Sequence, residues 1–202
     1  MTESRPFTEE RLRRFIRDER DPAWPSPEAS DNDVAALHAR VIAALHSSAT
    51  TVEEDLDDHG SGYASYKEVW IRSALEPFDR APDGRVMKLA VRVRMSKLAP
   101  LAESQAAWSW AREHDAIADA RSRARWVRAA QPTGWTYSLA ALPDAPDWEA
   151  VARHVAMSLA AHGFSIVPED QFAIPLWFDA KIATLSSDPP YTVGDAIFHW
   201  ID

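Results

Sequence analysis

The chain has 202 residues, 46% of them hydrophobic and 26% charged, and a formal net charge of −9. This length and composition predict one ordinary globular domain. The absence of cysteine excludes disulfides, thiolate catalysis and Cys-ligated zinc or iron–sulfur sites. The chain also lacks an apolar stretch of about 20 residues and an apolar signal-peptide region at its start. We therefore expect a soluble, cytoplasmic protein without membrane contact, and the excess of Arg over Lys is typical of a GC-rich bacterial genome.

Acidic and basic residues are unevenly distributed along the chain. Residues 1–60 carry a net charge of −7, residues 85–130 carry +6, and residues 131–202 carry −7. This pattern disfavours general nucleic-acid binding, because nucleic-acid-binding domains are usually basic overall. The acidic ends suit a basic protein partner. The basic middle segment could equally pair with acidic segments of the same chain.

The first thirty residues predict a helical arm and a Pro-rich linker. Thr8 can cap a helix over residues 8–19, and Phe7 can pack on Leu12 just inside it. The apolar stripe of this helix is narrow, so we expect the arm to lie on the body of the protein or on a second subunit. Trp24 can pin the linker that follows. We divide the chain into an arm and linker, 1–30, and a single α+β domain, 31–202.

The domain begins with a predicted helix over residues 33–47, in which apolar residues recur at helical spacing. An acidic loop follows, and then two strands, of which the clearer spans residues 85–96. In that strand one face is apolar and the other carries Lys88, Arg92 and Arg94. Because side chains alternate along a strand, we expect a half-buried strand with a basic outer surface.

Residues 104–120 are rich in alanine and predict a helix. Residues 121–130 fit either a continuation of that helix or a new strand, and both geometries gather three arginines on one side. A further helix is predicted from Asp147, as N-cap, to Gly163, followed by short strands. Thr192 and Asp195 predict a capping box for a short C-terminal helix. The order of elements favours an α+β fold, with a mixed or antiparallel sheet packed by helices.

The familiar catalytic and cofactor motifs are absent from the sequence. It contains no phosphate-binding glycine loop, no GxSxG and no HExxH. We therefore expect no cofactor and assign no catalytic residue.

One acidic loop resembles the opening of an EF-hand calcium loop. The match stops at His59, where Asp or Asn is expected, and at Tyr66, where a bidentate Glu is expected. We favour a solvated loop and assign no metal ligand, but metal binding stays open for Asp55, Asp57, Asp58 and His59. His38 and His46, eight residues apart on a predicted helix, would need a third ligand from elsewhere.

The binding hypothesis rests on Trp and Arg residues, which are the favoured anchors of protein interfaces. Trp108 and Trp110 lie two apart, so on a helix they cannot both face the core. The candidate binding residues are Arg112, Arg121, Arg123, Arg125, Arg128, Trp108 and Trp126.

Three functions remain open at this point. We favour a non-catalytic binding or regulatory protein, an adaptor or an immunity-like protein, that contacts a macromolecule through this Trp/Arg surface and the acidic flanks. The alternative is an enzyme or small-ligand binder whose anionic substrate is held by the Arg121–Arg128 cluster. The third is a structural subunit whose arm packs on a neighbour. The sequence decides neither the partner nor the oligomeric state.

Overall fold

A mixed β-sheet forms the centre of the protein. The computed structural model describes residues 6–47, 50–54, 63–73, 79–80, 85–112, 136–137, 146–184 and 188–201. The strands of the sheet are β1 Thr50–Glu54, β3 Tyr66–Ser73, β4 Asp79–Arg80, β5 Arg85–Ser96, β6 Leu101–Arg112, β7 Thr136–Tyr137 and β8 Ser165–Ile166. Five of them lie in the order β1-β3-β5-β6-β7 with antiparallel neighbours. β4 pairs with β5, and β8 runs parallel to β6.

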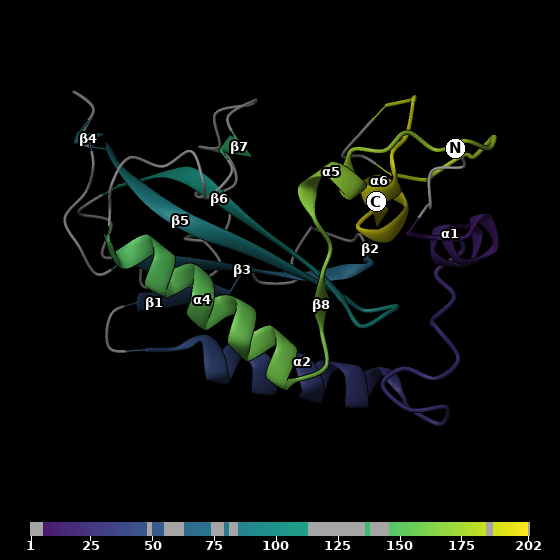
Figure 1. Ribbon diagram of the computed structural model, residues 1–202, viewed down its shortest axis with the longest axis horizontal. Helices are drawn as coiled ribbons and strands as arrows, with labels where there is room; N and C mark the ends of the chain where they lie inside the picture. Colours follow the sequence, from purple (N-terminus) through teal and green to yellow (C-terminus); the bar gives the residue numbers. More distant parts are fainter. Residues whose placement is uncertain are drawn as a thin grey trace.

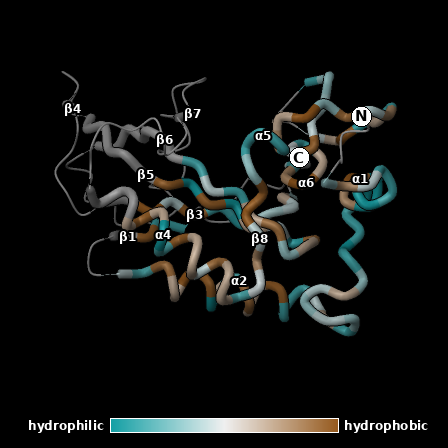
Figure 2. Tube along the Cα trace, in the orientation of Figure 1, coloured by the Kyte–Doolittle hydropathy of each residue, from teal (hydrophilic) through white to brown (hydrophobic). Residues whose placement is uncertain are grey.

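Two long helices, α2 (Asp31–Leu45) and α4 (Pro146–Ala161), cover one face of this sheet (Figure 1). Figure 2 shows hydrophobic residues concentrated where these helices meet the central strands. The core between these layers is built from Val34, Leu37, Val41, Ile42, Leu45, Val69, Ile71, Val91, Val93, Met95, Val151, Val155 and Leu159. Each such side chain contributes about 1.5–3 kcal/mol when fully buried. The arrangement is a single α+β domain, as the sequence predicts.

Both long helices follow the predicted periodicity, although their starts differ from the prediction. α2 begins earlier because Ser30 caps it: the Ser30 hydroxyl accepts a hydrogen bond from the Asp33 backbone N–H, and the Asp33 carboxylate accepts one from the Ser30 N–H at 2.7 Å. α4 begins at Pro146, so the predicted N-cap Asp147 is wrong and lies inside the helix. Proline suits the first helical position, where no N–H is needed. Gly163 follows the helix end with φ +83°, as predicted.

The predicted helix over residues 104–120 is wrong, because residues 101–112 form strand β6. This strand pairs with β5 from Ala102, opposite Met95, to Arg112, opposite Arg85. The turn at residues 97–100 returns the chain directly onto β5. Alanine favours a helix by less than about 1 kcal/mol per residue, and continuous pairing with a neighbouring strand outweighs that preference.

The acidic loop predicted after α2 is also partly wrong, because residues 50–54 form the strand β1. Its β-branched residues Thr50, Thr51 and Val52 fit a pleated surface. Two strands follow as expected, β3 (Tyr66–Ser73) and β5 (Arg85–Ser96), and Val91, Val93 and Met95 are fully buried on the apolar face of β5. The short C-terminal helix is confirmed as α6 (Val193–Ile197), with the Thr192–Asp195 capping box.

The arm folds back onto its own chain. Its helix α1 (Glu9–Ile16) is capped by Thr8 and contacts α6. Phe7, Leu12 and Phe15 are buried in a second core that the arm shares with the C-terminal segment. That segment contains α5 (Glu169–Phe172), and a small second sheet pairs β2 (Tyr63–Ala64) with β9 (Trp200–Ile201). Trp24 is buried in the main core, as predicted for the linker.

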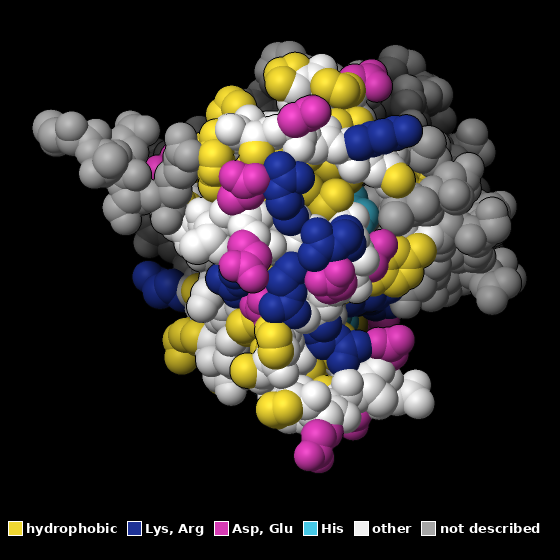
Figure 3. Space-filling model, turned by 90° about the vertical axis from the view of Figure 1, so that its right-hand side faces the viewer, with side chains coloured by type: hydrophobic (Ala, Val, Ile, Leu, Met, Phe, Trp, Pro, Cys, Tyr) yellow, Lys and Arg dark blue, Asp and Glu magenta, His cyan; other side chains and the backbone are white. Residues whose placement is uncertain are grey.

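The surface that carries the arm is a mosaic of both charges (Figure 3). The arginines of α1 and its following turn are paired locally: Arg11 with Asp21, Arg13 with Glu9, Arg14 and Arg17 with Glu19, and Arg20 with Asp31. Exposed pairs of this kind contribute about 0–1 kcal/mol each.

None of the helices in the described part of the chain is long and apolar enough to cross a membrane. The proposed boundary between residues 30 and 31 stays a prediction.

Candidate binding groove

A groove with a volume of about 940 Å³ runs beside α2. Ligand sites commonly enclose about 300–1,000 Å³. α2 turns Val41 and Leu45 to the sheet, and the adjacent side of the helix carries alanines four residues apart. Because these side chains are small, they leave open space along the helix, and this space forms the groove. Its floor is made by Val34, Ala35, Ala39, Ile42, Ala43 and Leu98. The residues of this segment that line the groove run from Asp31 to His46, so the groove follows the whole of α2, which is about 22 Å long at 1.5 Å per residue.

The rim of the groove is acidic where it meets solvent. Asp31 pairs with Arg20, and Glu54 pairs with Lys67 at 3.4 Å. In both pairs the acidic side chain is more exposed to solvent than the basic one. The Asp31 side chain is 98% exposed against 24% for Arg20, and that of Glu54 is 48% exposed against 11% for Lys67. A charged molecule that approaches the groove therefore meets carboxylates first.

A third carboxylate, Asp18, is held at the rim by a buried histidine. Asp18 follows α1 with φ 57°, and its Oδ1 lies 2.9 Å from Nε2 of His199. The His199 ring is fully buried, and among the described residues its Nδ1 has no hydrogen-bond partner. Because Nε2 faces a carboxylate, this ring nitrogen carries the proton and donates it to Asp18. The backbone N–H of His199 donates to the Ser65 hydroxyl at 2.9 Å, which fixes the backbone behind the ring.

Tyr63 lies beside the acids of this rim. Partial burial, and then the charges of Asp18 and Asp31, raises the pKa of the Tyr63 phenol to about 12. Nearby negative charges act in this direction because they disfavour a second anion. The ammonium of Lys97 lies 5.4 Å from the centre of the Tyr63 ring, so one cation stands beside the acids.

His38 of α2 and His46, which directly follows this helix, both line the groove. His38 is buried, with Nε2 3.2 Å from the carbonyl oxygen of Ser96, and His46 is exposed at the end of the helix. Within the described ranges, His, Asp and Glu residues form no group of three that could hold a metal ion. Asp55, Asp57, Asp58 and His59 lie outside the described residues, so their metal binding stays an open question.

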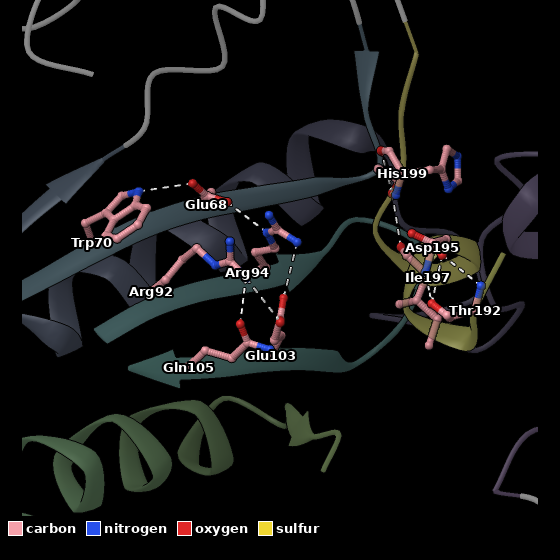
Figure 4. Close-up of polar contacts among 11 residues, drawn as sticks. Glu68, Trp70, Arg92, Arg94, Glu103, Gln105, Thr192, Asp195, Ile197 and His199 are labelled. Carbon is pink, nitrogen blue, oxygen red and sulfur yellow. Dashed lines mark hydrogen bonds and ion pairs between the residues drawn. The ribbon is translucent and has the colours of Figure 1, made fainter. Parts of the chain in front are cut away.

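A second polar site lies on the face of the sheet that points away from α2 and α4. Residues that alternate with the core positions form two rows across β3, β5 and β6: Trp70, Arg92 and Gln105 in one row, and Glu68, Arg94 and Glu103 in the other (Figure 4). The prediction of a basic outer surface on β5 is wrong here, because Arg92 and Arg94 are largely buried and paired.

Glu68 is the best satisfied member of this network. Its Oε2 accepts a hydrogen bond from Nε of Arg94 at 2.8 Å, and its Oε1 accepts one from Nε1 of Trp70 at 3.0 Å. Burial alone would lower the pKa of Arg94, but Glu68 and Glu103 together raise it above its ordinary value. For Arg92, burial and then the charge of Arg94 lower the pKa, against the opposing effect of Glu103. The nearby carboxylates therefore outweigh the effect of burial on the pKa of Arg94, but not on that of Arg92.

The predicted binding residues are only partly placed. Arg121, Arg123, Arg125, Arg128 and Trp126 lie outside the described residues. The backbone of Trp108 lies opposite Leu89, and that of Arg112 opposite Arg85, in the β5–β6 pair. The helical argument that separated Trp108 from Trp110 is wrong, because positions two apart on a strand share a face.

Sequence reasoning missed both sites. The alternation of β5 did show that Arg92 and Arg94 share a face, but their partners come from other strands, and Asp18 is 181 residues away from His199. Comparisons of the chain with protein-family models, with curated proteins and with solved structures found no match.

Proposed function

We propose that the protein is a non-catalytic binding protein that holds a basic segment of a partner macromolecule in the groove beside α2. The exposure pattern of the rim carries this proposal: in each rim ion pair the carboxylate faces solvent and the cation lies beneath it. Such a rim attracts basic groups and repels acidic ones, which gives both steering and selectivity.

The shape of the groove supports an extended or helical segment as the occupant. Its length of about 22 Å matches about six or seven residues of extended chain at about 3.3 Å per residue. Apolar grooves beside a helix are a common way to bind peptide segments. The alanine floor can take the backbone or small apolar side chains, while Asp31 and Glu54 pair with Lys or Arg of the partner.

The proposed groove uses the acidic flank that was expected from the sequence, but it lies beside α2 and not at the expected Trp/Arg surface. The rim acids Asp18, Asp31 and Glu54 all come from the acidic first sixty residues. The Trp/Arg segment from Trp108 to Arg128 stays a second proposed contact surface. An anionic substrate held by Arg121–Arg128 stays the alternative function. We propose the cytoplasm as the location, because a chain without cysteine suits a reducing compartment.

Neutralising the rim tests the proposed function. We expect the double variant Asp31→Asn/Glu54→Gln to bind a fluorescent Lys/Ala decapeptide about tenfold more weakly than the wild type at physiological salt. Two surface charges that contribute about 0.2–1 kcal/mol each give a change of this order. The matched control is Glu28→Gln/Asp188→Asn, which changes the net charge equally at exposed acids that do not line the groove.

A second variant separates the groove from general electrostatic attraction. Ala39→Trp places a large side chain on the floor without changing any charge. We expect it to block peptide binding while circular dichroism stays unchanged. Equal loss of binding in the rim variant and in the control pair, or full binding by Ala39→Trp, would contradict the proposal.

A further inference from the structure

Among the described residues that line the groove beside α2, acids and cations are equal in number. The acids are Asp18, Asp31 and Glu54, and the cations are Arg20, Lys67 and Lys97. The formal charges of this lining therefore cancel when histidine is counted as neutral, although the whole chain carries −9. An occupant with only basic groups would pair with the acids, but it would also bring positive charge close to the cations.

Lys67 lies deep on the strand side of the groove. Its backbone lies opposite Met95 in the β3–β5 pair, and the Met95 side chain is buried in the core between the sheet and α2. Cross-strand partners point to the same face of a sheet, so the Lys67 side chain points to the α2 side. It is largely buried beneath Glu54, with its Nζ 3.4 Å from Oε2 of that acid.

Lys97 enters the groove beside Lys67. The backbone N–H of Lys97 donates to the carbonyl oxygen of Ser65 at 2.8 Å, two residues before Lys67 along the chain. The Lys97 ammonium lies 5.4 Å from the centre of the Tyr63 ring, and Tyr63 also lines the groove. The strand side of the groove thus carries two lysines and a tyrosine, whereas the helix side carries the alanines of α2.

A basic partner changes the surroundings of these lysines. A Lys or Arg of the partner that pairs with Glu54 competes with Lys67 for the same carboxylate. The occupant also removes water from the groove, and a buried charge that loses its partner is strongly destabilising. An anionic group of the occupant, placed at the lysines, would remove this penalty.

We propose that the segment bound in the groove carries an acidic residue between two basic residues, and that Lys67 and Lys97 bind its carboxylate. This inference rests on the proposed function, because it names the chemistry of the occupant of the same groove. In an extended segment, successive side chains point in opposite directions. An acidic side chain directed inward at the lysines therefore has neighbours directed outward, where Asp31 and Glu54 are exposed and bind basic groups.

Two fluorescent decapeptides of Lys and Ala test this inference. They differ only at one central position between two lysines, which is Glu in one peptide and Gln in the other. We expect the Glu peptide to bind at least about fivefold more tightly at physiological salt, which corresponds to about 1 kcal/mol. General attraction to a chain of net charge −9 predicts the opposite order, because the Glu peptide is the less basic of the two.

Variants of the two lysines locate the contact. Lys67→Met and Lys97→Met keep most of the length of each side chain and remove the ammonium group, and in each we expect the preference for the Glu peptide to disappear. Lys97→Met keeps the test decisive if loss of the charge beside Glu54 disturbs the folding of Lys67→Met. Lys181→Met, at an exposed position that does not line the groove, changes the net charge equally and should retain the preference.

The outcomes separate this inference from the proposed function. If Ala39→Trp blocks both peptides but the wild type shows no preference for Glu, the acidic residue is contradicted and the basic segment stands. A preference for Glu that persists in both lysine variants would also overturn the inference, because the carboxylate would then bind elsewhere. Absence of binding by either peptide would overturn the proposed function, and this inference with it.

Discussion

At the scale of single residues, Glu68 is a buried acid on which both Arg94 and Trp70 depend. It is buried, its carboxylate pairs with Arg94, and it accepts a hydrogen bond from the Trp70 indole N–H. Breaking a buried ion pair by removing one partner costs about 3–5 kcal/mol, because the remaining charge is left buried and uncompensated. We therefore expect Glu68→Ala to lower the free energy of unfolding by about this amount in urea denaturation.

The control for this prediction is an acid that the fold does not use. Glu28 is exposed in the linker, and Glu28→Ala should change the free energy of unfolding by no more than about 0.5 kcal/mol. A loss below about 1 kcal/mol for Glu68→Ala would mean that water replaces the missing carboxylate.

The sequence placed Arg92 and Arg94 on one face, but it could not supply their acidic partners, because strand register is a tertiary property.

At the scale of elements, the cap of α2 decides where that helix begins. Ser30 and Asp33 satisfy each other's backbone N–H groups. Losing such a cap typically costs about 1 kcal/mol. We expect Ser30→Ala to lower the free energy of unfolding by about that much and to fray the first turn, measured by urea denaturation and by amide exchange. Ser26→Ala, at an exposed serine of the linker, is the matched control and should have no effect.

Elements that carry their own signal were predictable, and elements that depend on distant pairing were not. α2 and α4 show helical periodicity and local start or stop signals, so both were predicted to within a few residues. β6 reads as a helix because of its alanines, and only its partner β5 makes it a strand. β1 was predicted as a loop for the same reason. Its five residues form a strand because they pair with β3, and this pairing cannot be deduced from those residues alone.

At the scale of the whole molecule, two apolar clusters share the same chain and meet at the turn after β5. The main cluster lies between the sheet and the helices α2 and α4, and the second joins the arm to the C-terminal segment. Met95 belongs to the first cluster, while Leu98 and Leu101 belong to the second. The groove depends on both, because α2 forms its floor and the Asp18–His199 contact holds one end of its rim. No local sequence signal could have revealed a site assembled from such distant segments.

This arrangement predicts that the arm unfolds together with the rest of the protein. Phe15 is fully buried in the second cluster, beside residues of the C-terminal segment. Removing a buried phenylalanine ring typically costs about 3–5 kcal/mol. We expect Phe15→Ala to lower the free energy of unfolding by this amount in a single calorimetric transition, because the turn after β5 couples the two clusters. Met157→Ala, at a side chain that is 72% exposed on α4, should stay within about 0.5 kcal/mol of the wild type. Two separate transitions in Phe15→Ala would instead show that the arm and C-terminal segment form an independent unit, and the Asp18 end of the groove would then open without unfolding the sheet.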